Sequence, residues 1–467
     1  MATMSIARRA VGTLTCGSDL RKSVFLLALP AVGEQLLNTA VGLTDNYLVG
    51  HLAPDVAEAM GYGRATALAS VGLGNMVAWI TTILFMSVAV GSTAVIARRV
   101  GEGDHAGAER TLQQSLLLVF FTGALATAIG VFLGEPILRL LGATPEVAAI
   151  GGSYLRIIAY SFIPAAMMFA GTASLRGAGD MRSPLYLMAL VNVVNIAISW
   201  LLVNGMLGFP ALGVDGSAIG TAISRVVGGV VLLALLAAGR MRLRWRFDWR
   251  PQWDVLRRVL KVGLPFAADQ LVFNTAAVLV VRLITGLGTA SYAAHTLTIN
   301  IESISFLPGL GFAAAATTLV GQALGAKDEE RARRSAFEAL FQGGLIMTVL
   351  GAVMIAIPGT LLHIMTSEPT VIREAITPLR IAGLGQPLLA VFFILNGALR
   401  GAGDTKFTMY VRFITTWGLR GLLSFFFVGF LGMGLEGIWI AMAFDWIGHA
   451  LLSLWRWNSG YWRTIQV

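Results

Sequence analysis

The sequence is poor in charged residues and in side chains that bind metals or form disulfides. Only 13% of its 467 residues are charged, whereas soluble proteins have roughly 25%, so the charge is too sparse to cover a water-exposed surface of this size. The single cysteine, Cys16, excludes a disulfide framework, and the five histidines are too scattered to suggest a metal centre. No G-x-x-x-x-G-K-[ST] segment occurs, which excludes a P-loop ATPase motor within the chain. We therefore expect no cofactor.

Apolar residues dominate instead. Hydrophobic side chains make up 56% of the chain, and 54 glycines add to the apolar share. A membrane-spanning helix needs about 20 mostly apolar residues. Twelve such stretches lie near 24–49, 67–95, 112–133, 147–174, 184–204, 213–238, 258–286, 291–320, 336–357, 372–398, 407–430 and 436–457. The sequence therefore predicts an all-α integral membrane protein with twelve transmembrane helices.

Lysine and arginine are distributed unevenly along the connections between these spans. Most of the 34 fall before the first span, in the even-numbered connections and after the last span. Cytoplasmic loops carry such an excess, so both termini are expected on the cytoplasmic side of the cell (inner) membrane. The net charge of +9 then faces anionic lipid headgroups, and no nucleic-acid partner is expected.

The chain contains an internal duplication. Residues 29–36 resemble residues 264–271, and the run L-R-G-A-G-D occurs at 175–180 and again at 399–404. Each repeat contains six spans, so both halves have the same orientation and a pseudo-two-fold axis along the membrane normal would relate them. Two such lobes around a central cleft are typical of transporters that work by alternating access.

This duplication predicts the domain organisation. We expect an N-terminal lobe of six helices over 1–238, a cytoplasmic basic linker over 239–257 and a C-terminal lobe of six helices over 258–467.

Several of these features resemble the multidrug and toxic compound extrusion family, especially its DinF-like branch. They are the paired L-R-G-A-G-D turns, a first span with Pro30 and Asp45, and an eighth span with His295, Glu302 and Pro308. The resemblance covers nearly the whole chain. It implies a secondary antiporter, not an enzyme, that exports small organic and often cationic compounds in exchange for H⁺ or Na⁺. A monomer embedded in the lipid bilayer is expected.

Acidic side chains in the first span are candidates for ion binding. Glu34 and Asp45 are eleven residues apart, which returns a helix to within about 20° of the same face, and Asn38 lies between them. A carboxyl group in a membrane is costly, and it can hold a proton, or a sodium ion when ionised. A hydrogen bond that packs two helices together is the alternative. The resemblance implies cation binding by Asp45.

Neutral polar residues of the fifth span form a second candidate group. Asn192, Asn195 and Ser199 are spaced along one helix face. The resemblance implies a sodium site formed by Asp45, Asn195, Ser199 and Thr221 of the sixth span. DinF-like members carry aspartate where Ser199 stands, so a proton held by Asp45 is as plausible as sodium. Packing between helices is the alternative for these neutral residues.

The second half departs from other branches of the family. Where NorM-like and eukaryotic members carry two carboxylates, this chain has Phe273 and Leu389. It offers Asp269, the repeat partner of Glu34, as a cation or proton site, with structural pairing to Arg282 as the alternative.

The eighth span supplies two further candidates. Glu302 is expected to bind a cation or proton, with structural pairing to Arg282 as the alternative. His295, seven residues earlier on the same face, is expected to be a hydrogen-bonded structural residue near the cleft. Asp445 and His449 are four residues apart and are expected to pair with each other. The side chains expected at the substrate cleft are Gln35, Asn38, Asn192, Gln270 and His295.

Two other interpretations depend on arginine and glycine. A flippase for a lipid-linked oligosaccharide or cell-wall precursor would need arginines in the cleft, and Arg225, Arg282, Arg412 and Arg420 fall within spans. An enzyme acting on lipid lacks a convincing nucleophile and base. The L-R-G-A-G-D runs are interpreted as structural turns in which each aspartate caps the next helix, and the abundant glycine as a means of close helix packing.

Overall fold

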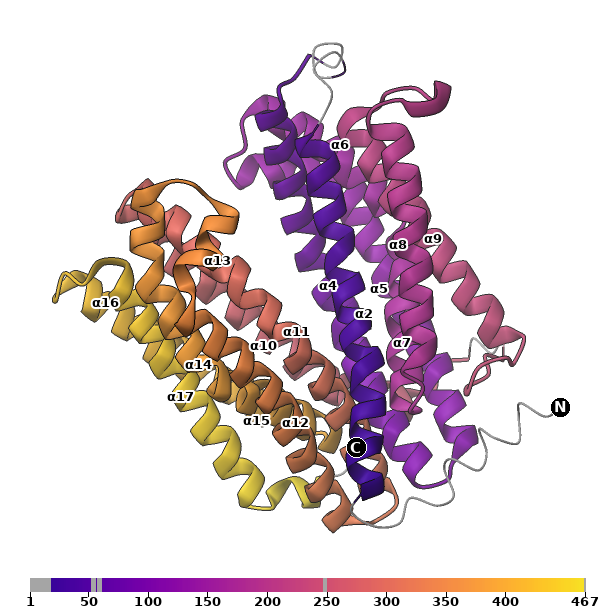
Figure 1. Ribbon diagram of the computed structural model, residues 1–467. Coiled ribbons are helices and arrows are strands. Elements are labelled where there is room, and N and C mark those ends of the chain that lie inside the picture. The colour runs from indigo at the N-terminus through magenta and orange to yellow at the C-terminus, as the bar shows by residue number, and fades with distance from the viewer. Residues whose placement is uncertain (1–17, 52–55, 57–60, 247–249, 466–467) are drawn as a thin grey trace. The chain divides into compact units, whose positions relative to one another are not determined.

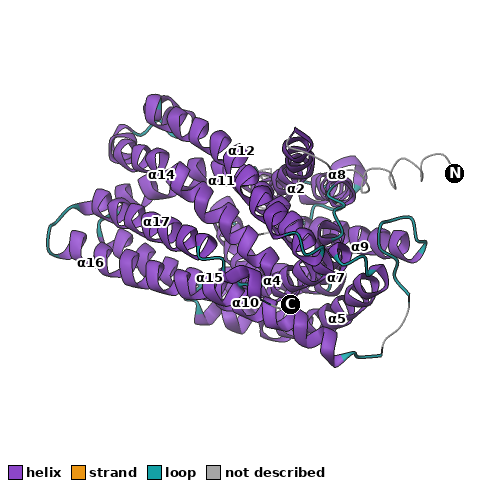
Figure 2. Ribbon diagram, turned by 90° about the horizontal axis from the view of Figure 1, so that it is seen from below, coloured by secondary structure: helices purple, strands orange, loops and turns teal. Residues whose placement is uncertain are grey.

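The computed structural model describes residues 18–51, 56, 61–246 and 250–465. Cys16 and part of the predicted linker lie outside these ranges. The described residues form helices joined by short loops, without strands (Figure 2). Because a bilayer offers backbone groups no hydrogen-bond partners, helices that satisfy their own backbone are the expected solution.

Eleven of the described helices are long and apolar enough to cross a membrane, and a bent helix pair makes a twelfth. Figure 1 labels them. The eleven are α2 (Ser18–Gly50), α4 (Arg64–Gly101), α5 (His105–Leu140), α8 (Arg182–Val203), α9 (Gly213–Ala237), α10 (Trp253–Gly286), α11 (Thr289–Gly325), α12 (Glu329–Ala356), α14 (Pro369–Ala402), the continuous helix of α15 (Thr405–Arg412), η2 (Phe413–Gly421) and α16 (Leu422–Gly429), and α17 (Gly434–Asn458).

The fourth predicted span is broken. It consists of α6 (Pro145–Ala159) and α7 (Phe162–Gly177), which bend by 54° at Tyr160 and Ser161. Short helices η1 (Met206–Gly208), α13 (Pro358–Met365) and η3 (Tyr461–Thr464) complete the described elements. The prediction of an all-α membrane protein with twelve spans is confirmed.

The helices group into two compact units. The N-terminal unit is Gly33–Ala267, and the C-terminal unit comprises the residues up to Val32 together with Ala268–Val467. Helices α2 and α10 therefore each contribute to both units, and each changes unit close to an internal proline, Pro30 or Pro265. The lobe boundaries predicted from the sequence stay a prediction.

Close helix packing is repeated in the two units. Thr93 of α4 donates a hydrogen bond to the carbonyl of Ala173 on α7 at 2.9 Å. Thr317 of α11 likewise donates to the carbonyl of Gly397 on α14 at 2.7 Å. At both crossings a glycine of the L-R-G-A-G-D run faces the threonine backbone. A Cβ at Gly401 would lie 2.2 Å from the Thr317 carbonyl oxygen, so only glycine allows this approach.

The aspartates that end the two L-R-G-A-G-D runs behave differently. Asp180 accepts hydrogen bonds from the backbone N–H of Ser183 at 3.0 Å and from its hydroxyl at 2.6 Å, which caps the start of α8. The expectation of a second cap is wrong, because the carboxylate of Asp404 makes no capping hydrogen bond. It accepts instead from Arg456 Nε of α17 at 2.7 Å.

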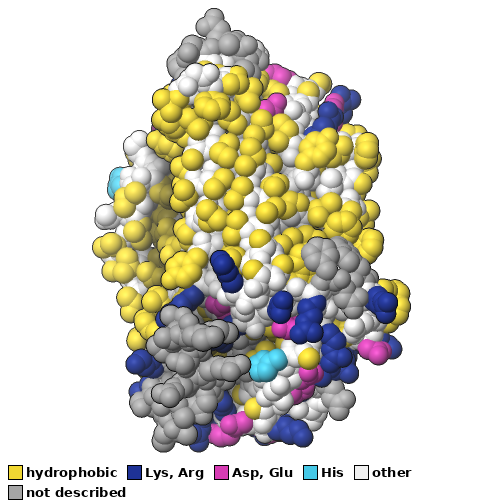
Figure 3. All heavy atoms as spheres, turned by 90° about the vertical axis from the view of Figure 1, so that its right-hand side faces the viewer, with side chains coloured by type: hydrophobic (Ala, Val, Ile, Leu, Met, Phe, Trp, Pro, Cys, Tyr) yellow, Lys and Arg dark blue, Asp and Glu magenta, His cyan; other side chains and the backbone are white. Residues whose placement is uncertain are grey.

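Hydrophobic side chains cover a broad area of the face drawn in Figure 3, whereas lysines and arginines gather toward its lower end. Exposed apolar surface of this extent suits contact with lipid chains.

Candidate functional site

A buried carboxylate of α2 lies at the centre of the N-terminal unit's polar site. Asp45 is 2% exposed. Its Oδ1 accepts a hydrogen bond from Ser217 at 3.0 Å, and its Oδ2 accepts one from Thr221 at 2.7 Å. Both hydroxyls come from α9, where they stand one helical turn apart. Each carboxylate oxygen therefore has a fixed donor, which holds the group in one orientation.

The neighbouring helix α8 adds two polar side chains. It lies beside α9 (Figure 1). Asn195 donates from Nδ2 to the Thr221 hydroxyl at 2.9 Å, while Ser199 packs against Gly220, the residue before Thr221. Asn195 Oδ1 and Ser199 Oγ are buried and have no hydrogen-bond partner among the described residues. Two oxygen acceptors thus stay unused close to the carboxylate.

This group has the chemistry of a site for a small hard cation. It combines one carboxylate with amide and hydroxyl oxygens, which suit a proton or an alkali ion. Nowhere in the part of the chain that the structure describes do three His, Cys, Asp or Glu side chains gather to hold a metal ion. Hydrogen bonds join Asp45, Asn195 and Thr221, three of the four residues of the sodium site that the sequence resemblance implies.

Sequence reasoning missed Ser217. The spacing could have indicated it, because Ser217, Thr221 and Arg225 follow one another at intervals of about one helical turn and so lie on one face of α9. Arg225 lies within electrostatic reach of Asp45.

The side chains expected at the substrate cleft in this unit differ in their hydrogen bonds and in their exposure. Asn192 donates to the carbonyl oxygens of Leu37 and Met188, both at 2.9 Å, and so ties α8 to α2. Asn38 is exposed and Gln35 is half-buried.

Glu34 and Asp269 occupy equivalent positions of the repeat and both form ion pairs. Arg176 Nη1 of the first L-R-G-A-G-D run donates to Glu34 Oε1. Arg400 Nη2 of the second run lies 3.5 Å from Asp269 Oδ2, and Arg412 Nε donates to Asp269 Oδ1 at 3.1 Å. In both places a guanidinium supplies the positive charge that a bound cation would bring.

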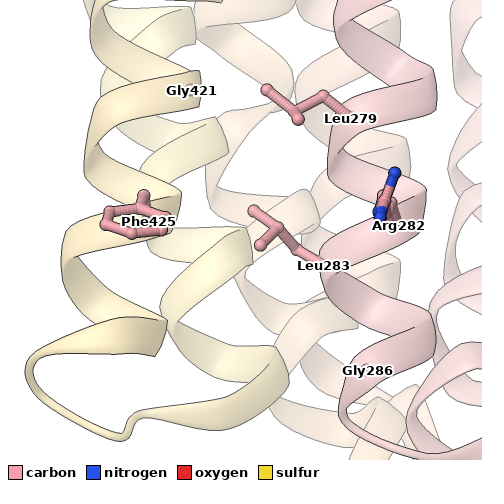
Figure 4. A pocket seen from close by; sticks show the side chains of 6 residues that line it. All are labelled: Leu279, Arg282, Leu283, Gly286, Gly421 and Phe425. Carbon is pink, nitrogen blue, oxygen red and sulfur yellow. The ribbon is translucent and has the colours of Figure 1, made fainter.

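The alternative prediction, that Asp269 pairs with Arg282, is therefore wrong. Arg282 lies elsewhere, on the edge of an apolar groove of about 340 Å³ between α10 and η2–α16. Figure 4 shows Leu279 and Leu283 pointing toward Phe425 across this groove, with Arg282 on another side of α10. Gln270, the neighbour of Asp269, is half-buried.

A second buried carboxyl, Glu302 of α11, lies in the C-terminal unit. It is 1% exposed, and neither carboxyl oxygen has a hydrogen-bond partner among the described residues. Next to it, Ser305 donates to the Glu302 backbone carbonyl at 2.6 Å and lies 2.8 Å from Gln386 Oε1. His295 Nδ1 is also buried without a described partner, so the expected hydrogen bond is absent at that nitrogen, and its ring packs 5.5 Å from Trp439.

Asp445 forms the expected pair with His449 and a closer one with an arginine. His449 Nδ1 lies 3.4 Å from Asp445 Oδ1, whereas Arg420 Nη2 lies 2.7 Å from Asp445 Oδ2. Thr415 lies 2.6 Å from the same histidine nitrogen.

Comparison with known proteins adds independent information. The MatE family model matches residues 30–201 and 265–426. The chain is 32% identical over 449 residues to "Probable multidrug resistance protein NorM" of Thermotoga maritima, covering 96% of this chain and 94% of that protein. It is 26% identical to "Uncharacterized transporter YisQ" of Bacillus subtilis, covering 95% of this chain and 96% of that protein.

Solved structures share the fold. A MATE protein crystallised in complex with MaD3S has a TM-score of 0.85 at 24% identity, covering 94% of this chain and 96% of that one. An outward-facing multidrug resistance MATE family transporter has a TM-score of 0.86 at 23% identity, covering 94% of this chain and 95% of that one. Since the family model matches well over half of the residues, the chain belongs to the MatE family of multidrug and toxic compound extrusion proteins and is a multi-pass membrane transporter, not an enzyme.

Proposed function

We propose that this protein exports small organic compounds, often cationic ones, in exchange for H⁺ or Na⁺ bound at Asp45. The observation that carries the proposal is a buried carboxylate held by two hydroxyls, with Asn195 Oδ1 and Ser199 Oγ unused beside it. The name of the Thermotoga maritima relative supports a multidrug substrate range.

Charge balance explains why this site suits ion exchange. A carboxylate inside a membrane is costly unless a positive charge neutralises it. The hydrogen bonds from Ser217 and Thr221 bring partial positive charge to Asp45, and Arg225 acts on it from a distance without forming an ion pair among the described residues. A bound proton or sodium ion would complete the neutralisation and favour one conformation of the transporter, and its release would favour another. Alternating access between such states would couple ion entry to substrate exit.

Two of the four arginines that would suit a lipid-linked pyrophosphate have carboxylate partners. Arg412 pairs with Asp269 and Arg420 pairs with Asp445, and both arginines are 8% exposed. A flippase is therefore less well supported than an exporter.

We also propose that the protein works as a monomer in the cell (inner) membrane with both termini cytoplasmic. The distribution of lysine and arginine supports this orientation.

Efflux from proteoliposomes tests the proposed exchange. A fluorescent organic cation would be followed under a proton gradient and, separately, under a sodium gradient. Wild-type protein is expected to respond to at least one gradient. Asp45→Asn should abolish the response, because it removes the charge and keeps the shape. Ser217→Ala, which removes one hydrogen bond, should weaken the response without abolishing it.

Asp215→Asn is the matched control. It changes another aspartate of the same unit whose carboxylate bonds a serine, Ser153, at 3.1 Å. This variant should keep gradient-driven export. Normal export by Asp45→Asn would show that the coupling ion binds elsewhere.

A further inference from the structure

The environment of Glu302 does not suit a charged carboxylate. The side chain is 1% exposed, and both of its oxygens are buried with no hydrogen-bond partner among the described residues. An ionised carboxylate without hydrogen bonds is among the most costly groups to bury. A carboxyl group that carries a proton is neutral and can stay there at much lower cost.

The groups that face Glu302 are also short of one positive charge. Arg420 of η2 acts on Glu302 electrostatically, but it donates to Asp445 of α17 at 2.7 Å. A single guanidinium thus acts on two carboxyl groups, and its ion pair is with Asp445. His295 of α11 also lies within electrostatic reach of the same guanidinium.

The other polar groups of this cluster come from α17, η2 and α14. His449 of α17 lies beside Asp445, and Thr415 of η2 lies against that histidine. Helix α14 contributes the neutral amide of Gln386, which bonds Ser305.

The hydrogen-bonding capacity of Arg420 matches that of Glu302. Arg420 Nε is buried and has no hydrogen-bond partner in the described ranges, so the guanidinium that acts on Glu302 keeps one unused donor. Arg420 also lies in η2, a π-helical stretch of nine residues. Turns of this kind are rare and frequently occur at functional sites. Conversion of a π turn to α-helix would rotate the residues beside it and give Arg420 a way to move.

We propose that Glu302 is a proton-binding residue independent of Asp45, and that its proton decides which carboxylate holds Arg420. With the proton bound, Arg420 pairs with Asp445 alone, as in this structure. When the proton leaves, Arg420 shifts toward Glu302 and loosens its pair with α17. This inference goes beyond the exchange at Asp45 because every group involved belongs to the C-terminal unit.

Infrared spectroscopy of the purified full-length protein tests this directly. The carbonyl stretch of a protonated carboxyl group is measured at neutral pH in sodium-free buffer, with Asp45→Asn as the background so that Asp45 contributes nothing. A band is expected in this background. Glu302→Gln should remove it, whereas Glu374→Gln, a control glutamate whose carboxylate accepts from Ser291 at 2.7 Å, should leave it unchanged.

The proposed change of partner by Arg420 predicts a second result. Asp445→Asn frees the arginine to pair with Glu302, so the glutamate should ionise and the band should be lost at neutral pH. If that variant does not fold, Arg420→Gln replaces it and should keep the band, because Glu302 then has no guanidinium to favour its charge.

Five outcomes would overturn the proposal. They are a band missing from the background protein, a band that survives Glu302→Gln, a band unaffected by Asp445→Asn, a band lost in Arg420→Gln, and a band removed by sodium at constant pH. Since the resting protein is measured without transport, failure here would be separate from failure of the exchange proposed at Asp45.

Discussion

Replacing Arg176 by glutamine should destabilise the protein more than replacing Arg400, although the two arginines hold equivalent positions of the repeat. Among the described residues Glu34 pairs with Arg176 alone. Asp269 contacts Arg400 at 3.5 Å and Arg412 at 3.1 Å. Removing one partner of a buried ion pair costs about 3–5 kcal/mol, because a charge stays buried without a counter-charge.

The contacts set the expected sizes of the two losses. Arg176→Gln should lower the free energy of unfolding by about 3 kcal/mol, the lower end of the range for a buried pair, because the Glu34 and Arg176 side chains are 12% and 21% exposed. Arg400→Gln should lower it by about 1 kcal/mol, the size of one ordinary hydrogen bond, because the closer partner of Asp269 remains.

Equilibrium unfolding in mixed detergent micelles would measure both values, provided that the transition is reversible. Glu34→Gln combined with Arg176→Gln should recover most of the loss, since the double variant leaves no charge unpaired. Arg400→Gln combined with Arg412→Gln should cost about as much as Arg176→Gln. Equal losses from Arg176→Gln and Arg400→Gln would refute the reasoning, as would a double variant of Glu34 and Arg176 that is no more stable than Arg176→Gln.

Two further predictions concern packing and orientation. Gly401→Ala should lower the free energy of unfolding by about 1–3 kcal/mol, because its Cβ would lie 2.2 Å from the Thr317 carbonyl oxygen. The control, Gly429→Ala, places its Cβ where no atom lies within 4 Å and should cost less than about 1 kcal/mol. Both values come from the same unfolding measurement. Cys16, the only cysteine, should react with a membrane-impermeant thiol reagent only after cells are permeabilised; labelling of intact cells would contradict a cytoplasmic N-terminus.

The spans could be predicted from the sequence because a bilayer imposes one requirement on all of them. About 20 apolar residues in helical form are needed for each crossing, and every predicted stretch corresponds to a helix or to the bent pair. The break between α6 and α7 could not be read from hydropathy, since the apolar run continues through it. Pro164 in the first turn of α7 was its local signal, because proline is tolerated at the start of a helix and not in its interior.

The ion-pair partners of the buried acids were harder to predict than the buried acids themselves. Asp45, Asp269 and Glu302 could be singled out from the sequence because a carboxylate within a membrane span has a high desolvation free energy. Their partners depend on which helices pack together. Asp269 pairs with residues more than a hundred positions away, and not with Arg282 on its own helix. Ser217 was missed for a related reason: a serine in a helix can bond its own backbone, so its presence does not predict a partner on another helix.

The internal repeat separates two kinds of buried acid. Glu34 and Asp269 are repeat partners, and both are neutralised by arginines that are themselves repeat partners, as expected for a contact that supports the fold of each half. Asp45 and Glu302 have no acidic counterpart, because the equivalent positions are Val280 and Ala78, both buried. Asp445 is a third buried acid without an acidic counterpart, since Ser224 holds the equivalent position, but it is neutralised by Arg420. Asp45 and Glu302 therefore differ from the other buried acids in having no hydrogen-bonded arginine among the described residues, and their surroundings leave room for a proton or a cation.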